Sequence, residues 1–223
     1  MIRLSHVSKQ YAGGHQALSD IELTLAAGSL TLLTGHAGAG KTTLLKLLAL
    51  LERPSHGRIT VAGMDLAHID RHGLPLYRRK LGMVLHDHRL LQDRPVFDNV
   101  ALPLMLCGHE PRIIKRRVHS TLDKLGLRHK ARQLPPALAA GEQQCVHIAR
   151  AVINHPRLLL LDEPLRDLEP ALAQDILRIF EWLQHSGATL LIATHDPVLI
   201  GTRRHPVYTL NGGRLSHPEA TDP

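Results

Sequence analysis

The chain has 223 residues, of which 43% are hydrophobic, and this is enough to bury the core of one α/β domain. Its first residues contain no apolar stretch typical of a secretory signal. Its most apolar stretches, residues 44–51 and 101–107, are shorter than the roughly 20 apolar residues that a membrane-spanning helix needs. We therefore expect a cytoplasmic protein that spans no membrane.

The formal net charge of +7 predicts a partner with negative charge, either a nucleic acid or the anionic face of a membrane. The basic clusters at 78–80, 115–117 and 203–204 are interpreted as solvated faces. Aromatic residues make up 3% of the chain, which argues against a platform that stacks single-stranded bases. Cys107 and Cys145 lie far apart without the spacing of metal ligands, so we expect two reduced thiols.

Strand-like segments open the chain. Residues 2–7, 21–25 and 58–62 are short pieces bounded by Gly or Pro turns, which predicts a small antiparallel β layer. Apolar runs of strand length then alternate with helical patterns in the first and last thirds of the chain, as in a parallel sheet covered by helices. The predicted fold is α/β, with a parallel core sheet and the antiparallel layer beside it.

A glycine-rich motif follows the strand-like residues 30–34 and leads into a helical run, which is the context of a Walker A P-loop. Glycines let backbone amides turn toward phosphate oxygens, and the helix adds its positive N-terminal end. We expect Lys41 to bridge the β and γ phosphates of ATP and Thr42 to give its hydroxyl to Mg2+. The predicted nucleotide contacts are Gly35, His36, Ala37, Gly38, Ala39, Gly40, Lys41, Thr42 and Thr43.

The middle of the chain has a different pattern. From residue 88 to residue 154 the periodicity is mainly helical and is interrupted by prolines. We predict a helical subdomain here, inserted into a nucleotide-binding core of residues 1–87 and 155–215 within a single domain over 1–223. The polar tail, residues 216–223, is expected to be flexible.

A second chemical motif follows the leucine run 158–161, which is typical of a buried strand. The run ends in Asp162 and Glu163, two carboxylates at the edge of the sheet where phosphate chemistry takes place. In this Walker B pattern we expect Asp162 to hold Mg2+ through water. Glu163 is expected to polarise the water that attacks the γ phosphate.

Residues 138–144 read Leu-Ala-Ala-Gly-Glu-Gln-Gln and stand just ahead of this motif. With the two Walker motifs they make the chain similar, over nearly its whole length, to the ABC-transporter ATPases, whose signature reads LSGGEQQ. The resemblance implies an ABC-type P-loop NTPase that acts as a head-to-tail homodimer with two sandwiched nucleotides. In such a dimer the signature residues Ala139, Gly141 and Glu142 face the nucleotide of the other protomer.

The same resemblance assigns three further residues. Tyr11 stands where the family stacks an aromatic ring on adenine, and His195 stands where it keeps a histidine that senses the γ phosphate. His86 stands where the family has a glutamine that contributes to catalysis and to the Mg2+ site. The resemblance therefore implies catalytic roles for Glu163, His195 and His86, and a Mg2+ site made by Thr42, Asp162 and His86.

Within that family the chain resembles the FtsE group of cell-division ATPases, on residues 11–14, 33–36, 87–91, 93–94 and 98–101. This resemblance implies a polytopic membrane partner similar to FtsX, which docks around residues 86–100. It also implies a place on the cytoplasmic face of the inner membrane and no specific nucleic acid. Relatives that serve lipoprotein release and macrolide export share the same core and remain alternatives.

Several positions depart from the family pattern. Ala139 and Ala140 replace the signature serine and its first glycine, and Cys145 and Glu169 replace an arginine and an aspartate. A hydrogen bond to a charged group is worth about 1.5–3 kcal/mol, so loss of the serine hydroxyl predicts slow but real hydrolysis.

Two other functions are compatible with the sequence. One is an ATP-gated scaffold that does not hydrolyse ATP, which the degenerate signature favours. The other is a soluble ABC protein that acts on nucleic acid, although such proteins usually carry two ATPase modules or a long coiled coil. The pair His86 and His88 has metal-ligand spacing but no third ligand, so we interpret it as ordinary loop histidines.

Overall fold

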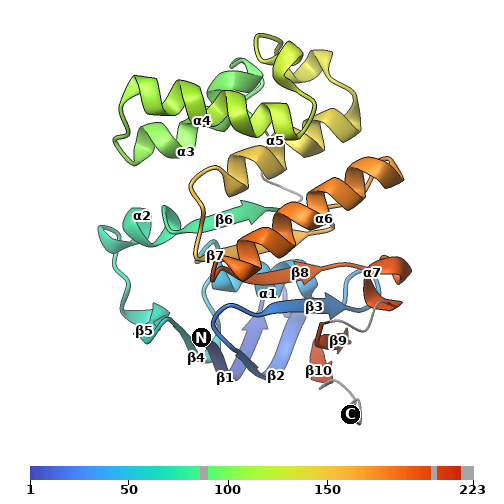
Figure 1. Ribbon diagram of the computed structural model, residues 1–223. Helices are drawn as coiled ribbons and strands as arrows, with labels where there is room; N and C mark the ends of the chain where they lie inside the picture. The colour runs from blue at the N-terminus through green and yellow to red at the C-terminus, as the bar shows by residue number, and fades with distance from the viewer. Residues whose placement is uncertain (86–89, 202–204, 217–223) are drawn as a thin grey trace.

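A computed structural model describes residues 1–85, 90–201 and 205–216 (Figure 1). Within these ranges the strands form two sheets, one ordered β2-β1-β4-β5 and one ordered β10-β9-β3-β8-β7-β6. The first sheet comprises β1 (Ile2–Gln10), β2 (Gln16–Leu25), β4 (His56–Val61) and β5 (Met64–Asp65). The second comprises β3 (Leu30–Thr34), β6 (Leu81–Val84), β7 (Leu158–Asp162), β8 (Thr189–Ala193), β9 (Val207–Asn211) and β10 (Arg214–Ser216).

The first sheet is antiparallel, which confirms the predicted layer, but its strands are longer than predicted. β1 and β2 extend toward each other until Gln10 pairs with Gln16. The added residues 8–10 of β1 are polar, and the added part of β2 has only Ala17 and Leu18 as apolar residues, so no apolar alternation marks these ends in the sequence. Residue 62, predicted to end the third strand, lies outside β4 because Ala62 takes a left-handed φ of 51°.

In the second sheet, β6, β7, β8, β3 and β9 run parallel and only β10 pairs antiparallel. All residues of β7 and β8 are buried, as expected for strands covered on both faces. Leu159 and Leu161 pack into the cluster that contains Phe180, whereas Leu158 and Leu160 pack into the cluster that contains Leu44. The sheet therefore separates two cores and leaves its carboxyl edge free for polar residues.

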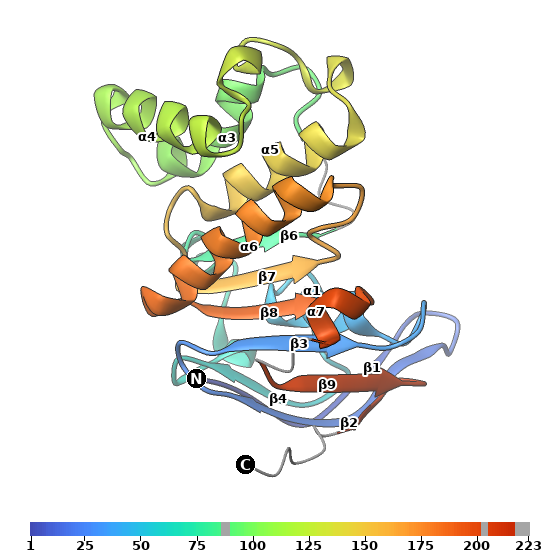
Figure 2. The same cartoon turned by 45° about the vertical axis from the view of Figure 1, so that its right-hand side comes forward.

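Helices α1 (Lys41–Leu48) and α6 (Pro170–His185) pack against the strands β7 and β8 of this sheet, and α2 (Gly73–Arg78) and α7 (Pro197–Gly201) are two short helices. Helices α3 (Val96–Leu106), α4 (Pro111–Lys124) and α5 (Ala140–Val152) lie together at one end of the molecule, and the first sheet and the N-terminus lie at the other (Figures 1 and 2). Short 3-10 turns span Leu66–His68, Arg128–Lys130 and Pro135–Ala137.

Helices α3 to α5 fall within the segment 88–154, and their apolar faces meet in one cluster around Val100, Val118 and Ile148. That cluster also includes buried residues of β7 and α6, so these helices are packed onto the core. Gly82 of β6 allows a close approach, because a Cβ atom there would lie 2.4 Å from the carbonyl oxygen of Ala151 in α5. The boundaries of a separate helical subdomain remain a prediction.

Candidate functional site

The P-loop connects the carboxyl end of β3 to the first residue of α1. Gly35 has a φ of 144°, and a Cβ atom there would lie 2.2 Å from the carbonyl oxygen of Leu210. Gly40 has a φ of 108°, and a Cβ atom there would lie 2.6 Å from the carbonyl oxygen of Ala17. Both positions therefore require glycine, because a side chain would be strained and would also collide with backbone.

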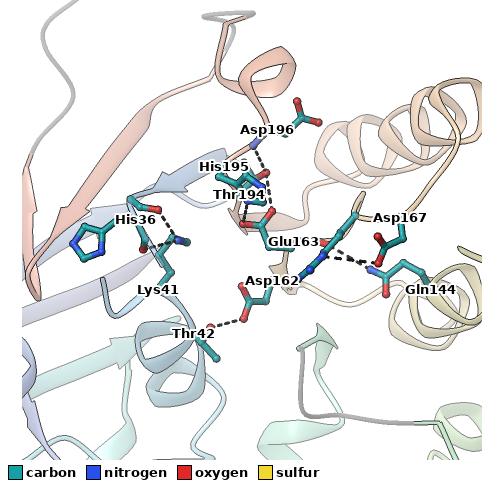
Figure 3. A network of polar contacts seen from close by, with 12 residues as sticks. His36, Lys41, Thr42, Gln144, Asp162, Glu163, Asp167, Thr194, His195 and Asp196 are labelled. Carbon is teal, nitrogen blue, oxygen red and sulfur yellow. Dashed lines mark hydrogen bonds and ion pairs between the residues drawn. The ribbon is translucent and has the colours of Figure 1, made fainter. Parts of the chain in front are cut away.

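The Lys41 ammonium folds back over this loop (Figure 3). Its Nζ donates hydrogen bonds to the carbonyl oxygens of Gly35, at 2.7 Å, and of His36, at 3.2 Å. These two carbonyls hold the positive charge at the mouth of the loop, where α1 also presents the positive end of its dipole. The loop thus offers backbone N–H groups and a cation to an anion, as its sequence predicts.

Two Walker residues from distant parts of the chain are in direct contact. The Thr42 hydroxyl donates a hydrogen bond of 2.6 Å to Oδ2 of Asp162, across a separation of 120 residues. Asp162 is the last residue of β7 and is 9% exposed. A hydroxyl and a carboxylate are hard oxygen donors of the kind that Mg2+ prefers, and phosphate and water would complete its shell. The two residues therefore fit the predicted magnesium site.

Glu163 follows in a strained conformation, with a left-handed φ of 47° that is uncommon for a residue with a Cβ atom. Its backbone N–H donates to the carbonyl oxygen of Ala193, at 2.9 Å. Its carboxylate lies 2.6 Å from Nδ1 of His195 and accepts a hydrogen bond of 3.3 Å from the Thr194 hydroxyl (Figure 3). The end of β8 therefore fixes the orientation of this carboxylate.

Gln144 connects helix α5 to the same turn. Its side-chain amide donates to the carbonyl oxygen of Pro164, at 2.9 Å, and reaches that of Glu163 at 3.5 Å. Sequence reasoning did not assign a role to Gln144 or Thr194, since neither contact follows from spacing. The start of α5 and the Walker B turn are thus mechanically linked.

A pocket of about 760 Å³ unites these elements. Its lining contains all nine predicted P-loop contacts, residues 35–43, together with Tyr11, Asp162, Glu163 and His195. His15, Ala17 and Arg166 also line it, although the sequence analysis did not single them out. Arg166 is the most consequential of these because it brings a second cation, 60% exposed, to the edge that carries Glu163.

Tyr11 lies at the wall of this pocket. Its hydroxyl is 3.4 Å from the Thr43 hydroxyl, and Nζ of Lys9 lies 4.9 Å from the centre of its ring. A cation over the ring face holds the ring in place. The role in adenine stacking remains a prediction.

The signature segment lies elsewhere, at the start of α5. Among the described residues that line the pocket, none is Ala139, Gly141 or Glu142. The Ala139 N–H donates to Oε2 of Glu142 at 2.9 Å, and Nζ of Lys130 lies 2.5 Å from Oε1 of Glu142. The hydrogen bond with Lys130, followed by that with the Ala139 backbone, lowers the pKa of Glu142.

Ala139 itself has only a methyl group at the N-cap position, so no side-chain oxygen caps α5. Only one half of a capping box is therefore present, the half that Glu142 supplies. Gly141 remains necessary, because a Cβ atom there would lie 2.9 Å from the carbonyl oxygen of Asp167.

Two other expectations concern metals and membranes. His86 and His88 lie outside the described residues. Across the described part of the chain, no three His, Cys, Asp or Glu side chains gather in a metal-binding group. No helix among those residues is long and apolar enough to cross a membrane.

A parallel sheet with a P-loop, a Walker B carboxylate pair and a signature helix defines an ABC-type ATPase. The model of the ABC transporter family matches residues 18–166. The chain is 49% identical to the cell division ATP-binding protein FtsE of Escherichia coli K12 over 215 residues, covering 96% of this chain and 97% of that protein. FtsE of Bacillus subtilis is 37% identical, with 99% and 96% covered. The chain belongs to the ABC transporter family and, within it, to the FtsE group of cell division ATP-binding proteins.

A solved structure of a dimeric ATP-binding cassette, in a post-hydrolysis state bound to ADP and phosphate, matches with a TM-score of 0.93. It is 27% identical, and each chain is covered completely. The predicted P-loop fold is confirmed by this likeness. As a member of this family, the chain is an ATP-binding protein and an ATP hydrolase.

Proposed function

We propose that this chain is the ATP-hydrolysing subunit of a membrane complex in bacterial cell division, and that it drives a polytopic membrane partner resembling FtsX. The observation that carries this proposal is the 49% identity to FtsE over nearly the full length of both chains. The pocket in which Lys41, Thr42, Asp162 and Glu163 meet supports the ATP-dependent part of it.

ATP binding begins at the P-loop. The β and γ phosphates take the place of the Gly35 and His36 carbonyl oxygens as partners of Lys41, since a phosphate accepts a stronger, charge-assisted hydrogen bond. Thr42 and Asp162 would hold Mg2+, Asp162 through water. When bound, Mg2+ neutralises charge on the phosphate oxygens. Tyr11 stacks on the adenine.

Hydrolysis uses Glu163 as the general base. A water oxygen forms a bond to the γ phosphorus while the bond from that phosphorus to the bridging oxygen of ADP breaks, and Glu163 accepts the proton that the water loses. The contacts with Thr194 and His195 orient the carboxylate for this step. His195 senses the γ phosphate, and His86 assists in catalysis and in the metal shell.

The active unit is a homodimer. Ala139, Gly141 and Glu142 lie outside this chain's own pocket, so we infer that they face the nucleotide of a second copy. The match to a dimeric ATP-binding cassette supports this arrangement. Without a hydroxyl at Ala139, closure relies on the backbone N–H groups and dipole of α5, and turnover is slow.

The partner docks near β6 and α3, and it holds the protein on the cytoplasmic face of the inner membrane. A groove of about 490 Å³ lies there, lined by Met83 of β6, by Leu102 and Leu106 of α3, and by Arg78 and Arg79. Leu76 and Met105 beside it are 58% and 57% exposed. This groove follows the predicted docking segment 86–100 in the chain, and it would extend the docking surface along α3 to Leu106.

Steady-state ATPase activity with and without the membrane partner, reconstituted in lipid, tests the proposal. We expect the partner to stimulate hydrolysis, and we expect a Leu106→Glu change in the groove to abolish the stimulation without changing the basal rate. A matched change at an exposed leucine outside the groove, Leu134→Glu just before the Pro135–Ala137 turn, should leave the stimulation intact. A partner that binds but never alters the rate would contradict the proposal.

A further inference from the structure

A second cavity lies away from the nucleotide pocket, between helices α4 and α6. Its volume is about 420 Å³, which is within the range of small-molecule sites. Helix α4 contributes basic and hydroxyl side chains to its rim, and the end of α5 with α6 contributes an apolar floor of Ile153, Ile179 and Leu183. No residue of the nucleotide site lines it.

The rim of this cavity is strongly positive. Arg116, Arg117, Lys124 and Arg178 line it, and no Asp or Glu is among the described residues that do. Asp175 pairs with Arg178 at 2.8 Å, on the exposed side of α6. Asp175 thus partly compensates Arg178, but the three cations of α4, Arg116, Arg117 and Lys124, repel one another at the rim. An anion bound between them would relieve that repulsion.

The pKa of a histidine in the cavity wall agrees with this charge pattern. His155 also lines the cavity, and burial lowers its pKa, with further contributions from the charges of Arg117 and Lys124. The positive field of the α4 side chains therefore reaches into the cavity.

The wall of the cavity is aromatic. Trp182 of α6 is 52% exposed although it is a large apolar ring. Nζ of Lys124 lies 5.7 Å from its centroid, and the ring of His155 packs edge to face at 5.4 Å. An anion that recruited Lys124 would uncover one face of the indole ring for a flat or apolar group.

We propose that this cavity binds an organic phosphate, whose phosphate group is held by Arg116, Arg117 and Lys124 and whose flat or apolar body rests against Trp182. Guanidinium groups match phosphate oxygens in a bidentate manner, and Ser120 and Thr121 add hydroxyl donors at the same rim. The size of the cavity favours a small molecule over a protein segment. A nucleoside monophosphate and a lipid with a phosphate headgroup both have this chemistry.

The chain has one tryptophan, so its intrinsic fluorescence reports on this cavity directly. The titrations use the full chain with Lys41→Ala, which weakens nucleotide binding at the P-loop by about a hundredfold or more. One arm adds a nucleoside monophosphate and the other adds dihexanoyl phosphatidic acid below its micelle concentration. Excitation is at the red edge of the indole band, where nucleotides do not absorb.

We expect a saturable change in emission in at least one arm, and the tighter arm identifies the source of the phosphate. Adding Arg117→Glu should weaken that binding by about tenfold or more, because it replaces a phosphate donor by a like charge. Arg112→Glu, the same change on an exposed turn of α4 outside the cavity, is the matched control and should leave the affinity within about twofold.

Calorimetry on the same variants gives the affinity without the optical probe, and a thermal melt of each variant shows that it is folded. No saturable signal in either arm, or equal weakening by Arg112→Glu and Arg117→Glu, would overturn the proposal. The proposal would also be overturned if the cavity bound an acidic peptide but bound neither the nucleoside monophosphate nor the phosphatidic acid.

Discussion

The P-loop and the start of α5 are two helix beginnings in one chain, yet they depend on different atoms. The P-loop presents backbone N–H groups, and the P-loop pattern does not specify the side chains of His36, Ala37 and Ala39. The signature segment of the family presents a serine hydroxyl, which Ala139 lacks. A site made of backbone therefore withstands side-chain replacement, whereas a site made of one side chain loses its donor with one substitution.

The largest expected effect comes from the one P-loop side chain that carries charge. Lys41→Ala removes the cation that faces the phosphates, and we expect ATP affinity to fall by about a hundredfold or more. Equilibrium binding of a fluorescent ATP analogue measures this. Lys115→Ala, on the exposed side of α4, is the control. Equal affinity in Lys41→Ala and wild type would show that backbone alone holds the nucleotide.

The next largest effect is expected on stability, at two neighbouring residues at the start of α5. Gly141→Ala places a Cβ atom 2.9 Å from the carbonyl oxygen of Asp167, so we expect a loss of about 1–3 kcal/mol in the free energy of unfolding. Ala140→Gly restores the family glycine at an exposed position and should cost no more than about 1 kcal/mol. Urea unfolding measures both. A larger loss in Ala140→Gly than in Gly141→Ala would contradict this account of the turn.

Ala139→Ser tests the missing hydroxyl. The serine supplies a donor toward the partner's γ phosphate, and we expect turnover to rise by about tenfold. It also caps α5, which should raise the free energy of unfolding by about 0.5–2 kcal/mol. Ala137→Ser makes the same change two residues upstream and should alter neither quantity. If Ala139→Ser raised the free energy of unfolding but not the turnover, the hydroxyl would only cap α5 and would not reach the γ phosphate.

A smaller effect is expected at the pocket residue that the sequence did not reveal. Arg166→Ala removes an exposed cation beside Glu163, so we expect ATP affinity to fall by only about two- to fivefold, and less at high salt. Binding isotherms at low and high ionic strength measure this, with Arg112→Ala as the control. An effect that does not depend on salt would indicate a structural role instead.

The last prediction concerns the reactivity of the two thiols, where we expect no effect on ATP binding or turnover. Cys145 in α5 is fully buried, and burial raises its pKa to about 11, whereas Cys107 is exposed. Because the thiolate is the reactive form, we expect iodoacetamide to modify Cys107 alone in the folded protein. Mass spectrometry of the modified peptides measures this. Rapid modification of Cys145 would show that α5 opens readily.

The features that could be predicted from the sequence are those whose residues are contiguous in the chain. A strand, a glycine loop and a helix identified the P-loop, and the leucine run before Asp162 identified Walker B, because both motifs are continuous in the chain. Their meeting at the Thr42–Asp162 contact follows from the common edge of parallel strands.

Other features depend on tertiary contacts and left no local signal. The left-handed conformation of Glu163 depends on its backbone bond to β8, and the Gln144 contact depends on how α5 packs against the Walker B turn. His15 and Arg166 reach the pocket from loops whose paths the sequence does not specify. The facing ends of β1 and β2 were missed because Ala17 and Leu18 are their only apolar residues, too few for a strand pattern, and hairpin pairing defines these ends instead.

The most direct test of ATP hydrolysis compares the steady-state ATPase rates of the purified wild-type chain and Glu163→Gln. General-base catalysis contributes about 10²–10⁴-fold, so we expect the rate of Glu163→Gln to be lower by at least about a hundredfold, with ATP binding unchanged. Equal rates in the two proteins would contradict it, and would make this chain an ATP-gated scaffold.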